Sequence, residues 1–413
     1  MTRWHRFVWA GFIPFATQGG CIHGPAAMRV GHARYNEAIH RTTSEQLLLN
    51  LLRLKYREPV LFLDIGSVAA QFTFRQAGGV GATLNENVGA PPINPDILRL
   101  SGDVTYQEQP TITFTPLQGD DFVNRLLTPL RLETIVLLAR SGWSIDRVLR
   151  LTVQQANGLD NATSASGPTP AVAPQYEAFA RMSRAFRNLQ RDGRLVIGYD
   201  VVPTVLSKSV PAVAVSAADV IQAAREGYRF RPIDDGSGYA LWGETRRLSW
   251  RIPPAAADTP EVREIVDLLG LAPDRNAYDI RARAGDSPSG APPGSRTEIN
   301  ITPRSLMGTL FYLSQAIETP ESHARRGVVT TTLDRDGQPF DWKSVTGDLL
   351  RVHVHTAAGD DPAVSVRYRG HRFYIDDTDL SSKATFSLLG QLFALQAGSE
   401  PGATPVLTLP IGG

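Results

Sequence analysis

Apolar positions recur at helical spacing in several segments of the chain. Residues 35–56 repeat leucine at this spacing, and residues 175–192 repeat large apolar side chains in the same way. Both segments therefore predict amphipathic helices. Similar patterns predict further helices at 119–127, 131–141, 216–226, 259–270, 303–318 and 379–396.

Strand-like segments lie between these helices. Residues 60–65 form a short apolar run, and residues 103–115 alternate polar and apolar positions, with Pro110 favouring a place at a sheet edge. Residues 68–74 fit either a second strand or a helix, and residues 78–102, rich in Gly, Pro and Asn, predict a long loop. Further strands are predicted at 194–202, 228–231, 238–252, 349–355, 363–368, 371–376 and 405–411.

Helices and strands alternate without a regular β–α–β rhythm, which predicts an α+β fold with helices packed on antiparallel or mixed sheets in two or three lobes. The predicted regions are 35–159, 175–272 and 297–413. Small and turn-favouring residues at 160–174 and 284–296 predict linkers or loops between them.

Composition and charge narrow the function. The chain has 413 residues, 42% of them hydrophobic, which is enough for a substantial core. Its net charge is +1 and it has no long basic run, so nucleic acid is not an expected partner. One cysteine leaves no basis for a disulfide framework or a multi-cysteine metal site. No cofactor is predicted.

The N-terminus has the layout of a secretory signal. Residues 1–6 contain two arginines and no acid, and residues 7–16 form an apolar run too short to span a bilayer as a helix. Small residues Gly19 and Gly20 then precede Cys21. These features predict an exported protein.

The Gly19-Gly20-Cys21 sequence resembles the lipobox of bacterial lipoprotein precursors. Gln18 departs from that pattern, which usually has leucine there. The resemblance implies a signal peptide at 1–20, acylation of Cys21, and a tether at 21–34 that joins the lipid to the body. The alternative is ordinary secretion with an unmodified Cys21.

The residue after the cysteine is Ile22 rather than aspartate, which by the same resemblance implies the outer membrane of a Gram-negative cell. The expected partners are the membrane, through the N-terminal lipid, and an envelope protein or an anionic envelope component.

A hairpin near the C-terminus is the most specific prediction for the body. If Arg369-Gly370 is a two-residue loop, Arg367 lies directly opposite Arg372 on the polar face of the sheet. Two opposed cations destabilise a sheet unless an anion neutralises them, so this face is a candidate site for an anion or an acidic partner. The alternative is a solvated sheet face. The candidate residues are Arg351, His353, His355, Arg367 and Arg372.

His353 and His355 also raise the question of a metal site, because alternate residues of a strand share one face. Zinc would need a third ligand, and His371, Asp376 and Asp377 are the nearest candidates in the sequence.

The sequence has no GxSxG, SxxK or P-loop motif. We therefore interpret the chain as a lipid-anchored cell-envelope protein with a binding or scaffolding role, whose molecular activity the sequence leaves open. The alternative is a periplasmic hydrolase or metal-dependent enzyme that uses the His353/His355 face.

Overall fold

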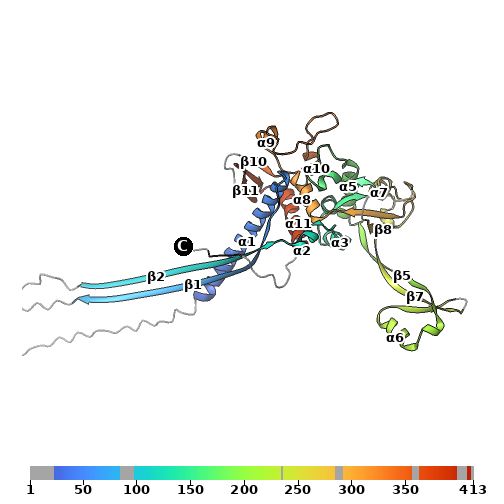
Figure 1. Ribbon diagram of the computed structural model, residues 1–413, viewed down its shortest axis with the longest axis horizontal. Helices are drawn as coiled ribbons and strands as arrows, with labels where there is room; N and C mark the ends of the chain where they lie inside the picture. Colours follow the sequence, from blue (N-terminus) through green and yellow to red (C-terminus); the bar gives the residue numbers. More distant parts are fainter. Residues whose placement is uncertain are drawn as a thin grey trace, which may run out of the picture.

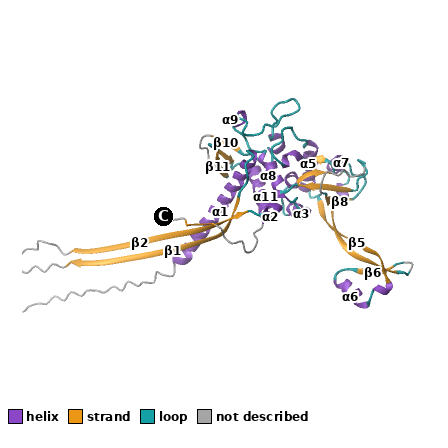
Figure 2. Ribbon diagram, in the orientation of Figure 1, coloured by secondary structure: helices purple, strands orange, loops and turns teal. Residues whose placement is uncertain are grey.

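The computed structural model describes residues 23–83, 97–233, 236–283, 292–355, 362–397 and 407–410. It confirms the α+β class. Figures 1 and 2 show a body of helices and sheets from which two long β-ribbons project in different directions. The main helices of the body are α1 (His23–Lys55), α2 (Asp120–Leu127), α3 (Leu132–Arg140), α4 (Ile145–Thr152), α5 (Glu177–Arg191), α7 (Pro260–Leu269), α8 (Leu306–Ser314) and α11 (Leu380–Ala397).

The largest sheet has seven strands in the order β4-β3-β9-β8-β7-β5, with β6 on β7. Only the β8–β9 pair within it is parallel. The strands are β3 (Val153–Ala156), β4 (Leu159–Asp160), β5 (Val196–Pro211), β6 (Arg229–Pro232), β7 (Gly238–Arg251), β8 (Ala277–Ala282) and β9 (Glu298–Pro303).

One hydrophobic cluster joins all three regions predicted from the sequence. It runs from Leu47 in α1 through Phe186 in α5 and Trp250 in β7 to Leu392 in α11. The regions therefore share a core. The short helices α9 (Glu321–Arg325) and α10 (Lys343–Thr346) lie in the connection between α8 and the C-terminal sheet.

Arg304 stabilises the centre of this body. Its side chain is 1% exposed, and its guanidinium donates hydrogen bonds to the carbonyls of Arg150, Val153 and Asn161. Two of these carbonyls belong to the end of α4, where a helix has unpaired acceptors and a negative dipole end. Burial lowers the pKa of the guanidinium to about 10, so it remains charged at neutral pH.

Residues 160–174 form an irregular loop with one short 3-10 helix at Thr163–Ser166, but this loop is packed against the core and is not an exposed linker. Ala162 and Ala165 are fully buried, and the Asn161 amide donates to the carbonyls of Arg150 and Val153. The small side chains that suggested a linker instead let the backbone approach the core closely.

The prediction of a loop at 78–102 is wrong at both ends of that segment. Strand β1 (Phe62–Thr83) continues to Thr83, and β2 (Ile97–Leu117) begins at Ile97. The two strands pair without interruption from Thr83↔Ile97 to Ser67↔Thr113. Glycines in this segment are accommodated because the ribbon is held by backbone pairing.

The root of this ribbon is held by α1. Gln46 exchanges hydrogen bonds with the backbone of Leu63, at 3.0 and 2.6 Å, and Asn50 does the same with Leu61, at 2.8 and 3.1 Å. The two amide side chains thus take the place of a neighbouring strand. On the other side of the ribbon, β13 (Leu407–Pro410) pairs with β2 from Phe114 to Thr111.

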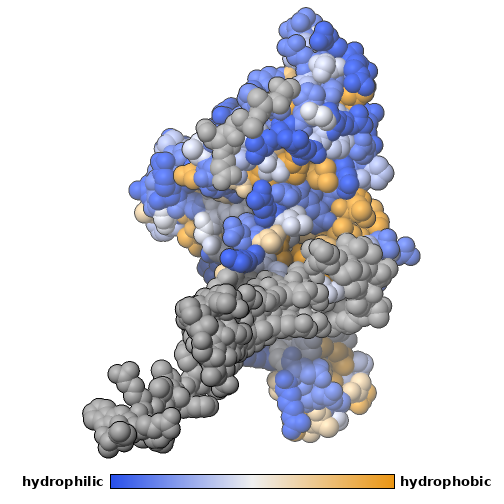
Figure 3. Space-filling view, turned by 90° about the vertical axis from the view of Figure 1, so that its left-hand side faces the viewer, coloured by the Kyte–Doolittle hydropathy of each residue, from blue (hydrophilic) through white to orange (hydrophobic). Residues whose placement is uncertain are grey.

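The second ribbon consists of β5 and β7, and it ends in β6 and α6 (Ala217–Arg225). No residue of α6 is buried, and Val213 beside it is 99% exposed. In Figure 3 this part lies at the lower edge, where hydrophobic residues stand among polar ones.

Helix α1 begins at His23, inside the segment expected to be a tether. The Ala-rich sequence after Pro25 favours helix, which explains the longer element. Cys21 and the expected signal peptide at 1–20 lie outside the described residues, as do residues 284–291 of the second expected linker. Among the described helices, none is long and apolar enough to cross a membrane.

Candidate functional site

The predicted C-terminal hairpin forms with the expected register. Strands β11 (Val364–Tyr368) and β12 (His371–Ile375) pair Arg367 with Arg372, and Arg369 and Gly370 both adopt positive φ, of 47° and 83°, in the turn. Strand β10 (His353–His355) adds to the other side of β12 and places His355 opposite Arg372. Three cationic or titratable residues therefore lie in one row across the sheet.

Acidic residues of α1 lie close to this row. Arg372 lines a polar cleft together with Glu37 and Glu45, and its guanidinium donates to the Ser365 hydroxyl at 3.1 Å. Arg367 lines a neighbouring cleft that also includes Glu45. Arg41, which forms an ion pair with Glu45, lines the first cleft as well, and among the described residues no carboxylate of α1 forms an ion pair with Arg367 or Arg372.

The two histidines have different surroundings. The His353 ring lies 3.3 Å from the Glu318 carboxylate, measured from Nδ1 to Oε2. The Tyr374 ring lies between the two histidines, with centroids 5.5 Å from His353 and 6.0 Å from His355. Among the described residues, no group of three His, Cys, Asp or Glu side chains is placed to hold a metal ion.

Arg351 does not join the sheet face. Its backbone N–H donates to the Ser382 hydroxyl, and its Nε–H donates to the Gly347 carbonyl at 2.6 Å. It lies instead at the rim of a cavity of about 440 Å³ between the end of α1, the segment after α8, and α10. A volume of this size suits a small molecule.

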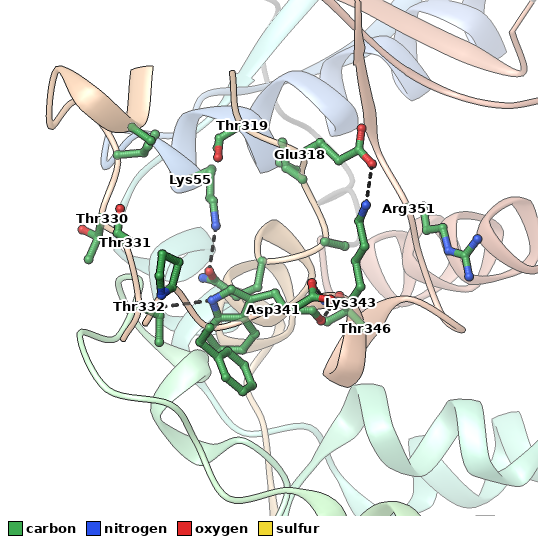
Figure 4. Close-up of a pocket in the computed structure, with 18 of the residues that line it drawn as sticks. Lys55, Glu318, Thr319, Thr330, Thr331, Thr332, Asp341, Lys343, Thr346 and Arg351 are labelled. Carbon is green, nitrogen blue, oxygen red and sulfur yellow. Dashed lines mark hydrogen bonds and ion pairs between the residues drawn. The ribbon is translucent and has the colours of Figure 1, made fainter. Parts of the chain in front are cut away.

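Lys55, the last residue of α1, lines this cavity (Figure 4). The residue is 5% exposed, and its Nζ donates to the Gln315 side-chain carbonyl at 3.0 Å. Among the described residues, no carboxylate lies within ion-pair distance of this ammonium group. Burial lowers its pKa to about 8.

The position of Lys55 is set by contacts around the end of α1. The Tyr56 hydroxyl hydrogen-bonds His323 Nδ1 at 2.7 Å, and the Arg369 guanidinium lies over the Tyr56 ring at 4.9 Å. Arg369 also forms an ion pair with Glu58 at 2.5 Å. These contacts fasten the end of α1 to the β11–β12 turn and limit the movement of the neighbouring Lys55.

A second charged group lies on the opposite side of the cavity. The Glu318 carboxylate forms an ion pair with Lys343 at 3.1 Å and also contacts His353. Burial alone would raise the pKa of the Glu318 carboxyl, but the Lys343 hydrogen bond and the charge of His353 outweigh it and keep the pKa below its ordinary value. In Figure 4 the Arg351 guanidinium lies beyond this pair as seen from Lys55.

Apolar side chains and threonine hydroxyls that already form hydrogen bonds within the protein complete the wall. The Thr332 hydroxyl donates to the Pro170 carbonyl at 2.7 Å and accepts from the Trp342 indole at 3.0 Å, so it has little left to offer a ligand. Lys55 is a buried charged residue of the cavity wall, and it has no ion-pair partner among the described residues. Apolar lining residues include Ile317, Val329, Phe340, Trp342 and Leu350.

No family model, no curated protein and no solved structure matches this chain. The geometry of the site itself is therefore the evidence for its function.

Sequence reasoning predicted the pairing of Arg367 with Arg372 correctly and expected His355 on the polar face of the neighbouring strand, but it missed the cavity. Lys55 stands at the end of a leucine-rich helix, and its main contact, Gln315, is 260 residues away. No local signal joins residues so far apart. The one available hint was a lysine on the side of α1 that also carries buried leucines.

Proposed function

We propose that this protein is a lipid-anchored component of the bacterial cell envelope whose body binds a small organic anion in the Lys55 cavity. The position of Lys55 carries the binding role. A buried ammonium group bonded only to a neutral amide is costly, because water has been removed and no opposite charge replaces it. A carboxylate or phosphate in the cavity supplies that charge.

The cavity favours this ligand over a cation. Of the two acids in the wall, Glu318 is half-buried and paired with Lys343, and Asp341 is exposed and accepts a hydrogen bond from the Lys343 backbone N–H. The apolar lining, with Phe340 and Trp342, suits the carbon skeleton of an organic acid. We place the anion here rather than against Arg372, because Arg372 is only partly buried and its guanidinium already donates to the Ser365 hydroxyl, whereas Lys55 is 5% exposed.

Binding should depend on pH in a defined direction. With a pKa of about 8, the Lys55 amine is mostly charged at pH 7 and mostly neutral at pH 9. Anion affinity should therefore fall as the pH rises through 8. A bound anion favours the charged amine and moves this midpoint upward.

Calorimetry with succinate, benzoate and inorganic phosphate tests the site. The wild-type protein should bind at least one of these probes at pH 7, and Lys55→Met should weaken that binding at least tenfold. Lys208→Met, which removes an exposed lysine from the second ribbon, is the matched control and should leave binding unchanged. Failure to bind all three probes, or equal binding by Lys55→Met, would contradict the proposal.

The anchor is tested separately. Cells given labelled palmitate should incorporate the label into the wild-type chain and not into Cys21→Ser, and the variant should move from the membrane to the soluble fraction. Its body should melt at the same temperature, because the lipid is joined outside the core. A Cys21→Ser protein that stays in the membrane fraction would rule out acylation as the anchor.

A further inference from the structure

Most of the two outer edges of the β1–β2 ribbon have no strand paired with them among the described residues. Its two strands remain paired for more than 15 residues beyond the body, from Ser67↔Thr113 to Thr83↔Ile97. In the described part of the chain, β13 covers only Thr111–Phe114 of one edge, and α1 side chains reach only Leu61 and Leu63 of the other. A two-stranded ribbon without a third strand or a helix is marginal in water.

The sequence of the ribbon alternates with a period of two. Even positions in both strands are mainly apolar, and odd positions are mainly polar, with the three charges of the paired segments 74–83 and 97–106 all at odd positions. The register pairs even with even, as in Phe74↔Tyr106, Val80↔Leu100 and Ala82↔Leu98. By position, therefore, the ribbon has one apolar and one polar face.

We propose that this ribbon pairs edge to edge with the ribbon of a second copy of the chain. Among the described residues, no further strand covers β1 at 67–83 or β2 at 97–110, and the two edges share the same alternation, so β1 of one copy beside β2 of the next continues an antiparallel sheet. Any other partner would need an edge of the same length with the same period.

The charges agree with this arrangement. When two copies lie side by side without an offset along the strands, Arg75 of one copy lies opposite Thr105 of the next copy. Asp103 of that next copy then lies two residues further along its strand. Opposite charges then face each other diagonally across the new edge. The shared sheet also keeps apolar positions together on one face, since a one-residue slip would mix the two faces.

Two double substitutions test whether association depends on the apolar face of the ribbon. Val80→Lys with Leu100→Asp places opposite charges at an apolar pair, and Gly79→Lys with Ser101→Asp places the same charges at the adjacent polar pair. The first variant should raise the concentration at half-association at least tenfold. The second is the matched control and should stay within twofold of the wild type.

A third variant removes the distal ribbon. Deleting residues 74–106 and joining Thr73 to Gln107, which are register partners, through an Asn-Gly turn leaves the body and the ribbon root in place. This variant should be monomeric and should retain the wild-type melting temperature of the body.

The association itself is measured on the full chain, by light scattering in mild detergent and in phosphatidylethanolamine–phosphatidylglycerol vesicles. A photoreactive residue at position 73 in unlabelled chains mixed with ¹⁵N chains reports which strand of another copy is adjacent. Crosslinks to the labelled ribbon in either medium support the proposal. A monomer in both media, or crosslinks only to the body, would overturn it.

Discussion

The body and the two ribbons are stabilised in different ways. In the body, a single cluster of buried side chains joins helices and sheets from the first third of the chain to the last. In the ribbons, strands are held by backbone pairing, and the end of the second ribbon exposes Val213 and Ile221. The difference predicts that the body folds without the ribbons, and it is the basis for our proposal that the first ribbon contacts another molecule.

The strongest test of the body is Arg304→Met, which removes the Arg304 donor from the Asn161 carbonyl and leaves the carbonyls of Arg150 and Val153 with the Asn161 amide alone. A hydrogen bond from a charged donor contributes about 1.5–3 kcal/mol, so the loss of three should lower the free energy of unfolding by more than about 3 kcal/mol. Arg246→Met on the second ribbon is the control and should change it by less than about 0.5 kcal/mol. Urea unfolding measures both, and similar losses would remove the contrast.

Lys55→Met should make the unliganded body more stable at neutral pH. The pKa of the lysine falls from 10.5 in the unfolded chain to about 8 in the folded protein. The unfolded chain therefore binds more protons between these values, and wild-type stability rises with pH across that range. The variant should gain about 2–3 kcal/mol at pH 7, and this gain should shrink towards pH 10. A gain that does not change with pH would place its cause outside Lys55.

The junction between body and ribbon is probed at α1. Asn50 is fully buried, so Asn50→Leu leaves the N–H and carbonyl of Leu61 unpaired and should cost about 2 kcal/mol. Gln46 is only half-buried, so Gln46→Met, which removes the equivalent bonds to Leu63, should cost about 1 kcal/mol. Thermal unfolding should rank the two in this order; the reverse order would show that β1 is held mainly further out.

The smallest effect is expected for removal of the second ribbon. Deleting 204–243 and closing Val202, Pro203 and Glu244, Thr245 with a two-residue turn respects the register of β5 and β7. The melting temperature of the body should change by less than about 2 °C, because α6 and its neighbours bury nothing in the core. A large loss of stability would mean that this ribbon belongs to the folding unit of the body.

Sequence patterns predicted the elements whose signals are local. The helix at 175–192 and the register of Arg367 with Arg372 follow from hydrophobic period and from turn chemistry. The patterns failed at 78–83 and 97–102, where glycines were interpreted as loop formers, and they did not show that the loop at 160–174 is packed against the core. In the structure the first two segments pair with each other, and the loop is fixed by Asn161, which donates to the carbonyls of Arg150 and Val153.

The candidate site was less predictable for the same reason. Its central contact joins Lys55 to Gln315, and its opposite wall depends on Glu318 meeting both Lys343 and His353. These residues are brought together by packing of α1 against α8, which no short motif records.

Hydrogen–deuterium exchange on the full chain tests the central contrast most directly. In dilute detergent, where the protein is monomeric, backbone amides of α5, α8 and α11 should exchange slowly, and those of residues 67–83 and 97–110 should exchange within seconds. At concentrations where copies associate, the ribbon amides should become at least tenfold slower while the body amides stay the same. Ribbon amides that are as protected in the monomer as in the assembly would contradict the account.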